Sequence, residues 1–313
     1  MIRAMRRENE AIVVVGSLNM DFVVQVGVLP RPGETVGGWG FRLLPGGKGA
    51  NQACAAARLG GRVAMIGRVG DDVFGGQLLA SLDAAGVETD GVLTAAGEPT
   101  GVALIPVERG GQNQIVVAPG ANHSLRPEEV TAALDARPAR FLLLQLETPP
   151  ETVAAAAARA QALGMTVVLD PAPAQALGAE LLGSVGLLTP NESEARVLLG
   201  LTPGGVTLGE AAEVARRLLA LGPRRVVLKL GAQGAWLADR DRSDHFPAPS
   251  VEAVDATAAG DCFNGALAVR LAEGAPLDEA VRFANRAAAI SVTRAGAQAS
   301  LPTRAEVDTG QNP

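Results

Sequence analysis

The 313-residue sequence contains no tyrosine, and aromatic residues make up only 3% of it. Proteins that bind single-stranded nucleic acid without sequence preference stack bases on aromatic side chains, so this scarcity argues against that class. No dense run of lysine and arginine occurs, and the formal net charge is −6. Nucleic acid and anionic membranes are therefore not expected as partners. Backbone N–H groups can still bind a small anion on an acidic protein.

Cysteine is equally scarce. Cys54 and Cys262 lie far apart and form no CxxC pair, which predicts neither a disulfide framework nor a zinc site. Residues 1–10 are charged and lack the apolar core of a signal peptide. No apolar run approaches the ~20 residues that cross a bilayer. We therefore expect a cytoplasmic protein without a membrane span.

Apolar residues are plentiful, at 48%, and short β-branched segments alternate with longer segments of helical spacing. The expected strands are 11–15, 62–66, 141–146, 166–169, 185–188 and 225–230. The expected helices are 49–59, 75–85, 151–163, 192–199, 208–221 and 260–273. Apolar strands that alternate with helices predict an α/β fold with a doubly wound, mostly parallel sheet flanked by helices. We expect one domain over residues 1–313.

Two segments, 22–44 and 100–118, interrupt this alternation. Both lack a helical pattern and show partial alternation of apolar and polar residues. In the second segment, Gly110 and Gly111 separate 102–107 from 114–117, as the turn of a β-hairpin would. We expect the two segments to form a small antiparallel β-lid over the carboxyl ends of the parallel strands, where α/β folds bind ligands.

Two polar, glycine-containing segments lie near the N-terminus. Segment 16–21, GSLNMD, directly follows the first expected strand, and its amide and carboxylate could bind adjacent hydroxyls of a ligand. Taken alone, an ordinary Asx turn explains it better. Segment 45–51, PGGKGAN, leads into an expected helix, and its glycines allow the backbone to approach a ligand. It lacks P-loop spacing, and a glycine-rich turn without a ligand fits equally well.

A third segment, 255–261, has the sequence DATAAGD and opens an expected helix. Small residues at a helix start leave N–H groups free, and the helix dipole adds positive potential, so this segment resembles an anion hole. Asp261 at the same end could accept a proton from an attacking hydroxyl group. The alternative is an N-capping aspartate. The density of small residues favours the functional interpretation.

These three segments, in this order and at these separations, resemble the ribokinase (phosphofructokinase B) superfamily. Four further segments agree with the resemblance: LQLE at 144–147, NESE at 191–194, KLGAQG at 229–234 and the C-terminal stretch 283–300. The resemblance covers roughly residues 12–308. It implies an ATP-dependent sugar kinase that phosphorylates the 5-hydroxyl group of D-ribose.

The resemblance implies a role for each matching residue. Asp261 would be the general base, and the N–H groups of Ala258, Ala259, Gly260 and Asp261 would stabilise charge on the transferring phosphoryl group. The residues implied to bind the sugar are Asn19, Met20, Asp21, Gly46, Gly47, Lys48, Gly49, Ala50, Asn51 and Glu147. Those implied to line the ATP site are Asn191, Lys229, Leu230, Gly231, Ala232, Gln233, Gly234, Gly260 and Asn285. Lys229 departs from the family, because many relatives carry a small hydroxyl residue there.

The resemblance also implies two metal ions. Glu194 would orient Mg²⁺ through water. A monovalent cation, usually K⁺, would bind oxygen ligands beside the anion hole and fix the loop that presents it. The residues implied at that cation are Asp255, Thr257, Ser291, Arg294, Gly296 and Ser300. Exposed apolar lid strands would be a liability in a monomer, so we expect a homodimer through the lid.

Alternative functions remain open. A kinase of the same superfamily could act on fructose, 2-keto-3-deoxygluconate, deoxyribose or a nucleoside, although the few aromatic residues disfavour a nucleoside. A sugar or nucleotide sensor without catalysis would have no need of Asp261. A nicotinamide-dependent oxidoreductase is disfavoured because no GxGxxG follows the first expected strand.

Overall fold

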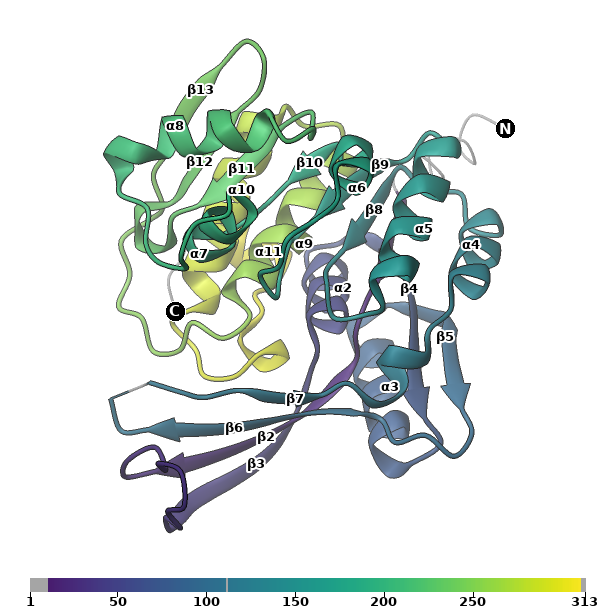
Figure 1. Ribbon diagram of the computed structural model, residues 1–313, viewed down its shortest axis with the longest axis vertical. Coiled ribbons are helices and arrows are strands. Elements are labelled where there is room, and N and C mark those ends of the chain that lie inside the picture. The colour runs from purple at the N-terminus through teal and green to yellow at the C-terminus, as the bar shows by residue number, and fades with distance from the viewer. Residues whose placement is uncertain (1–10, 111, 311–313) are drawn as a thin grey trace.

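The structure is a computed structural model that describes residues 11–110 and 112–310 (Figure 1). The expectations for residues 1–10 and for Gly111 fall outside the described residues. The main body is a nine-stranded sheet in the order β13-β12-β11-β10-β9-β8-β1-β4-β5. Its strands are β1 (Ala11–Val15), β4 (Arg62–Gly70), β5 (Glu88–Ala95), β8 (Phe141–Leu144), β9 (Thr166–Leu169), β10 (Leu187–Leu188), β11 (Val226–Lys229), β12 (Ala235–Ala238) and β13 (Ser243–Phe246). Seven strands, from β11 to β5 in this order, are parallel, and β12 pairs antiparallel with both β11 and β13.

Helices cover both faces of this sheet. They are α2 (Lys48–Arg58), α3 (Val73–Ala85), α4 (Pro127–Asp135), α5 (Pro150–Ala162), α6 (Ala179–Ser184), α7 (Glu192–Leu198), α8 (Leu208–Leu219), α9 (Ala259–Ala272), α10 (Leu277–Ser291) and α11 (Arg304–Thr309). Successive β1 side chains enter opposite cores, because side chains alternate along a strand: Ile12 packs with α2, α3, α9 and α10, whereas Val13 packs with α4 to α8. The doubly wound α/β fold is thus confirmed.

A second, four-stranded sheet extends away from the main body (Figure 1). Its strands are β2 (Asn19–Val26), β3 (Gly38–Gly46), β6 (Gly101–Glu108) and β7 (Val116–Ala118), in the order β3-β2-β6-β7. Each hairpin is antiparallel, but the hairpins join through a parallel pair, β2 with β6. The expected lid therefore exists, with one parallel pairing at its centre. Parallel pairing follows because β2 and β6 both leave the main sheet in the same direction.

The expected strands and helices all occur, with ends shifted by a few residues. Segment β5 was not expected, because it is an edge strand with mixed exposure rather than a buried apolar run. The short hairpin β12–β13 and helices α4, α6, α10 and α11 were also not assigned from the sequence. Within residues 11–110 and 112–310, no helix is both long and apolar enough to span a membrane. Cytoplasmic location stays a prediction.

Candidate active site

The candidate site lies where the chain reverses its direction across the main sheet. From β1 the chain adds β4 and β5 on one side and later adds β8 on the other. Loops that leave neighbouring strands in opposite directions open a crevice at the carboxyl ends of those strands. Here the Ser17 hydroxyl donates to Glu147 Oε2 at 2.5 Å, and the Lys48 N–H donates to the same oxygen at 3.2 Å. Glu147 therefore joins both N-terminal motifs.

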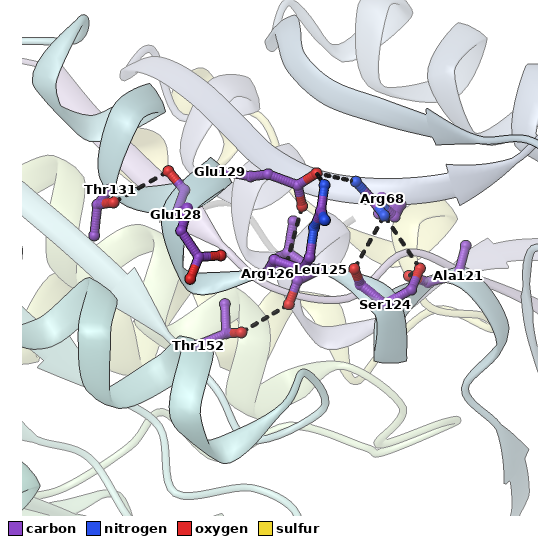
Figure 2. Close-up of polar contacts among 9 residues, drawn as sticks. All are labelled: Arg68, Ala121, Ser124, Leu125, Arg126, Glu128, Glu129, Thr131 and Thr152. Atoms are coloured by element: carbon purple, nitrogen blue, oxygen red, sulfur yellow. Dashed lines mark hydrogen bonds and ion pairs between the residues drawn. The ribbon is translucent and has the colours of Figure 1, made fainter.

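A polar cluster between β4, the turn at residues 120–124 and α4 supports the GSLNMD segment. Arg68 on β4 donates to the Ser124 carbonyl at 3.0 Å and pairs with Glu129 of α4 (Figure 2). This cluster holds the 3₁₀ turn η1 (Gly120–Ser124), which contains the buried Asn122. The Asn122 side chain accepts from the Leu18 N–H at 2.8 Å and donates to Asn19 Oδ1 at 2.8 Å. It thereby orients the expected sugar-binding amide.

The inner face of the lid and the site loops line an open cavity of about 660 Å³, which we call the lid cavity. Among the expected sugar-binding residues, it is lined by Asn19, Asp21, Gly47, Lys48, Asn51 and Glu147, and also by Asp261. Asn51 Oδ1 is buried but has no hydrogen-bond donor among the described residues. An unsatisfied buried acceptor is costly, so this atom fits a ligand hydroxyl. Lid residues Ala103 and Ile105 add apolar surface.

The backbone of the GGKGAN segment depends on glycine. Gly47 has φ of 87°, and a Cβ there would lie 2.6 Å from the backbone nitrogen of Asn19. Only glycine accepts this conformation and this close approach together. The two motifs are therefore packed backbone against backbone, which aligns their side chains on one wall of the lid cavity.

A second cavity, of about 550 Å³, lies on the other side of the α9 N-terminus, and we call it the Lys229 cavity. Among the expected nucleotide-site residues, it is lined by Asn191, Lys229, Gly231, Ala232, Gly234, Gly260 and Asn285. Glu194 and Asp170 also border it. Lys48, Ala258 and Asp261 border both cavities. The start of α9 is therefore the place where molecules in the two cavities would meet.

Free N–H groups gather at this shared boundary. Ala258 is the N-cap of α9 and has φ of 59°, a left-handed conformation that is strained for alanine. The Ala259 N–H donates to the Ala256 carbonyl at 3.2 Å. In the part of the chain described, the N–H groups of Ala258, Gly260 and Asp261 meet no backbone acceptor. These three groups and the helix dipole are suited to bind an anion, as the expected anion hole would, and the Ala259 N–H is only partly available for this.

Asp261 is 5% exposed and occupies the first turn of α9. Asn51 Nδ2 donates to its Oδ2 at 3.0 Å, and Gln52 Nε2 donates to its Oδ1 at 3.1 Å. Burial raises the pKa of Asp261 to about 6, against the opposing effect of the Lys48 ammonium. A carboxylate with this pKa is ionised near neutral pH yet is more basic than an ordinary aspartate, which suits a general base.

Two other ionisable groups on the lid-cavity wall are perturbed. Burial, together with the charges of Glu147 and Asp261, raises the pKa of Asp21 to about 7. Burial alone would lower the pKa of Lys48, but the carboxylates of Asp261 and Glu147 raise it above its ordinary value. Lys48 therefore stays an ammonium ion among carboxylates. Such clustering of perturbed groups in a cleft is typical of functional sites.

Of the expected K⁺ residues, Asp255, Thr257 and Gly296 lie together on two loops beside the start of α9. The Asp255 carboxylate accepts from the Thr257 N–H at 2.9 Å and from the Gly296 N–H at 2.8 Å, which ties the loops together. Burial would raise the pKa of Asp255, but these hydrogen bonds hold it below its ordinary value. Among the described residues, the carbonyls of Thr257 and Gly296 accept no backbone hydrogen bond. Free carbonyl oxygens fit a hard cation.

Glu194, the residue expected to orient Mg²⁺, is buried at the edge of the Lys229 cavity. Its carboxylate accepts from the Asn191 N–H at 2.7 Å and from Asn191 Nδ2 at 2.8 Å, so the α7 capping box fixes its orientation. Burial raises the pKa of Glu194, and the Lys229 ammonium opposes that shift. The described residues contain no cluster of three or more acidic, histidine or cysteine side chains able to hold a metal. These residues fit a Mg²⁺ ion bound mainly by phosphate and water.

Several expected site residues do not line either cavity. Met20 and Ala50 are buried in one core, and Leu230 in the other. Gly46 packs directly on the Asp21 carboxylate, and Gly49 packs on the backbone of Gly16 and Ser17. Gln233 is exposed, and its carbonyl contacts His245. Ser291, Arg294 and Ser300 also lie outside both cavity walls. The roles implied for these residues stay predictions.

The structure also brings in polar residues that the sequence did not single out. Gln52 and Asp170 join the Asp261 carboxylate to Lys229, and Asn122 orients Asn19. Asp170 directly follows an expected strand, and strand ends in parallel sheets meet at one edge. That rule could have identified Asp170. Nothing local in the sequence marks Gln52 or Asn122.

Comparisons with known proteins give one consistent result. The profile of the pfkB family of carbohydrate kinases matches residues 9–304. A ribokinase from Haemophilus influenzae is 42% identical over 95% of this chain and 97% of its own length. The crystal structure of a ribokinase from Thermotoga maritima is 40% identical, with a TM-score of 0.87 over 96% of this chain and 98% of that chain. Arabidopsis thaliana ribokinase complexed with ribose and ATP is 34% identical, with a TM-score of 0.86 over the same shares.

Proposed function

The chain belongs to the pfkB family of carbohydrate kinases, and we propose that it transfers the γ-phosphoryl group of ATP to the 5-hydroxyl group of D-ribose. The products are ribose 5-phosphate and ADP. The observation that carries this function is the position of Asp261 and Lys48 on the boundary between two cavities. In this proposal the lid cavity takes the sugar, because its polar wall can bind hydroxyl groups, and the Lys229 cavity takes the nucleotide.

The reacting groups meet at the start of α9. Asp261 accepts the proton of the sugar hydroxyl as its oxygen attacks the γ-phosphorus, and ADP leaves with the electrons of the broken P–O bond. The free N–H groups of Ala258, Gly260 and Asp261 lie where negative charge on the phosphoryl oxygens needs stabilisation. Asn51 and Gln52 hold the Asp261 carboxylate in one orientation.

The sugar hydroxyls bind to the polar wall of the lid cavity. Asn19, Asp21, Asn51 and Glu147 present acceptors and donors from three different elements, which allows several hydroxyls to be bound at once. The apolar lid residues Ala103 and Ile105 would cover the opposite side of the ring. A closed lid excludes water, which would otherwise compete as phosphoryl acceptor.

Two metal ions complete the proposal. Mg²⁺ would enter with the nucleotide, neutralise charge on its phosphates and be oriented through water by Glu194. K⁺ would bind to the free carbonyls of the two loops that Asp255 ties together. That ion would stabilise the loop preceding the anion hole without contacting substrate. Rubidium in place of K⁺ should retain activation, whereas replacement of all monovalent cations by tetramethylammonium should lower kcat.

The outer lid face supports a homodimer. Phe41, Leu43, Leu104 and Val116 lie on this face, and their exposed fractions run from 41% to 62%. Monomeric proteins rarely expose so many neighbouring apolar side chains. A second copy of the chain, packed lid against lid, would cover them. Light scattering should give a dimer mass for the wild type and a monomer mass for Leu104→Asp, and a monomeric wild type would contradict this.

An ADP-release assay with Mg-ATP and a panel of sugars tests the proposed reaction. The panel contains D-ribose, 2-deoxyribose, fructose, 2-keto-3-deoxygluconate and adenosine, each with and without K⁺. We expect turnover on D-ribose that K⁺ enhances. Preference for deoxyribose, or for another sugar, would keep the fold and the base but change the substrate. ATP binding without turnover on any sugar would indicate a sensor.

A further inference from the structure

Lysine is almost absent from this protein. Of its 27 basic side chains, only Lys48 and Lys229 are lysines, and all others are arginines. Both lysines border the Lys229 cavity. A lysine presents a compact point charge with three rotatable donors, whereas arginine presents a wide planar fork. The two positions at which this chain uses the compact cation are therefore both beside the anion hole.

The Lys229 ammonium lies directly over the first turn of α9. A Cβ built on Gly260 would be 3.2 Å from Lys229 Nζ, so no atom separates the ammonium from the helix start at this point. Lys229 is the last residue of β11, and its N–H donates to the Pro190 carbonyl at 2.8 Å. The backbone thus fixes the base of the side chain, and the side chain reaches across the cavity to the anion hole.

A buried aspartate holds this ammonium in place. Asp170 is 3% exposed, and its Oδ1 accepts from Lys229 Nζ at 2.8 Å. Asp170 Oδ2 accepts from Gln52 Nε2 at 3.0 Å, and the same Gln52 nitrogen donates to Asp261 Oδ1 at 3.1 Å. Gln145 Nε2 donates to Gln52 Oε1 at 2.7 Å, which fixes the direction of the Gln52 amide. Lys229 and the general base are thereby parts of one hydrogen-bonded chain.

This ion pair is poorly explained by stability alone. A buried ion pair seldom stabilises a fold more than apolar residues of similar size would, because both charges lose their hydration. An ammonium has three donors, and within the described residues Lys229 Nζ donates only to Asp170. Two donors remain for a ligand in the Lys229 cavity. A phosphate oxygen is the ligand that an ammonium beside free N–H groups would bind.

We propose that the Lys229 side chain contacts the transferring phosphoryl group, and that Asp170 is a positioning residue which holds Lys229 and, through Gln52, orients Asp261. The inference rests on the proposed function. During transfer the bond between the sugar oxygen and the γ-phosphorus forms, the bond to the ADP oxygen breaks, and Asp261 takes the hydroxyl proton. Lys229 keeps its protons and donates to a non-bridging oxygen, on which charge develops.

The first test is a set of three variants. Lys229→Met removes the charge at similar volume, Asp170→Asn removes the partner, and the double variant removes both. Lys229→Met should lower kcat by roughly 10²-fold, the usual loss for one transition-state donor, with ribose affinity unchanged. Asp170→Asn should also move the acid limb of kcat to lower pH, because the charge of Asp170 raises the pKa of Asp261.

The double variant separates chemistry from folding. Removing both charges leaves no unpaired buried ion, so thermal stability should recover relative to Asp170→Asn, in which Lys229 stays charged and unpaired. The rate should stay low, because the phosphate contact is still missing. If the double variant recovers kcat to within threefold of the wild type, Lys229 has only a structural role and the proposal is wrong.

A direct measurement uses the scarcity of lysine. Protein labelled with ¹⁵N only in lysine side chains gives at most two ammonium signals, which Lys229→Met assigns. With ADP, Mg²⁺ and aluminium fluoride in place of the phosphoryl group, the Lys229 signal should shift and exchange more slowly than with ADP alone. An unchanged Lys229 signal in a complex whose Lys48 signal shifts would overturn this proposal but leave the kinase function standing. No response of either signal to any nucleotide would argue against the nucleotide site itself.

Discussion

Acidification from pH 8 to pH 6 should strongly slow ribose phosphorylation at low sugar concentration. Aspartates with ordinary pKa values would stay ionised over this range and would cause almost no change. Burial raises the pKa of Asp21 to about 7 and that of Asp261 to about 6. The proposed roles require both groups to be ionised in the free enzyme, Asp21 to accept sugar hydroxyls and Asp261 to accept the proton. Because both pKa values are raised in the folded protein, the ionised carboxylates are lost as the pH falls from 8 to 6.

The size of the effect follows from the two values. If both carboxylates are required, the active fraction is roughly 0.9 at pH 8 and roughly 0.05 at pH 6, a fall of about 20-fold in kcat/KM. With Asp21→Asn, only the ionisation of Asp261 remains, and the fall over the same range is about twofold. The variant should be slower at every pH but should have the shallower acid limb.

The assay is kcat/KM for ribose from pH 5 to 9, at saturating Mg-ATP and constant ionic strength. Below pH 6 the logarithm of the wild-type value should approach a slope of two, and that of Asp21→Asn a slope of one. A wild-type profile that stays flat down to pH 5 would refute the assigned ionisations. Equal slopes in the two proteins would refute the role of the Asp21 charge.

Three further perturbations follow from the same contacts. Asp261→Asn should lower kcat by roughly 10³-fold, the range of general-base catalysis, with the calorimetric Kd for ATP within twofold of the wild type; near-normal turnover would remove Asp261 as the base. Glu147→Gln should raise the Kd for ribose about tenfold, since the charge that holds the Ser17 hydroxyl is lost; unchanged ribose affinity would contradict its place in the sugar site. Asn122→Ala should lower the free energy of unfolding by about 2 kcal/mol, because the buried Leu18 N–H loses its acceptor, and urea titration showing a change below about 0.5 kcal/mol would count against this.

The parts of the fold that the sequence predicted depend on local pattern. The apolar strand 11–15 and the small residues at 258–260 identify a buried strand and an open helix start without reference to the rest of the chain. The edge strand β5 was missed because half of its residues face solvent and its apolar pattern is weak. The parallel joining of β2 and β6 was missed because pairing between hairpins is a long-range property.

The candidate site divides in the same way. Asp261, Lys48 and Asn51 belong to short motifs, so the resemblance proposes their roles from the sequence, and the structure places all three at the lid cavity. Lys229 meets Asp170 across 59 residues, and Asn122 meets Leu18 across 104 residues. Such contacts depend on the order of strands in the sheet, which a single sequence does not specify. The sequence identified Lys229 as a departure from the family, and only the fold shows which carboxylate it contacts.

Identification of the product by NMR tests the central claim most directly. Wild-type protein and Asp261→Asn are each incubated with Mg-ATP and uniformly ¹³C-labelled D-ribose, and the phosphorus and carbon spectra are followed over time. The account predicts one new phosphomonoester, coupled to carbon 5 of ribose and formed in equal amount to ADP by the wild type, and almost none with the variant. Phosphate on another carbon, ADP with free inorganic phosphate, or equal product from the variant would contradict it.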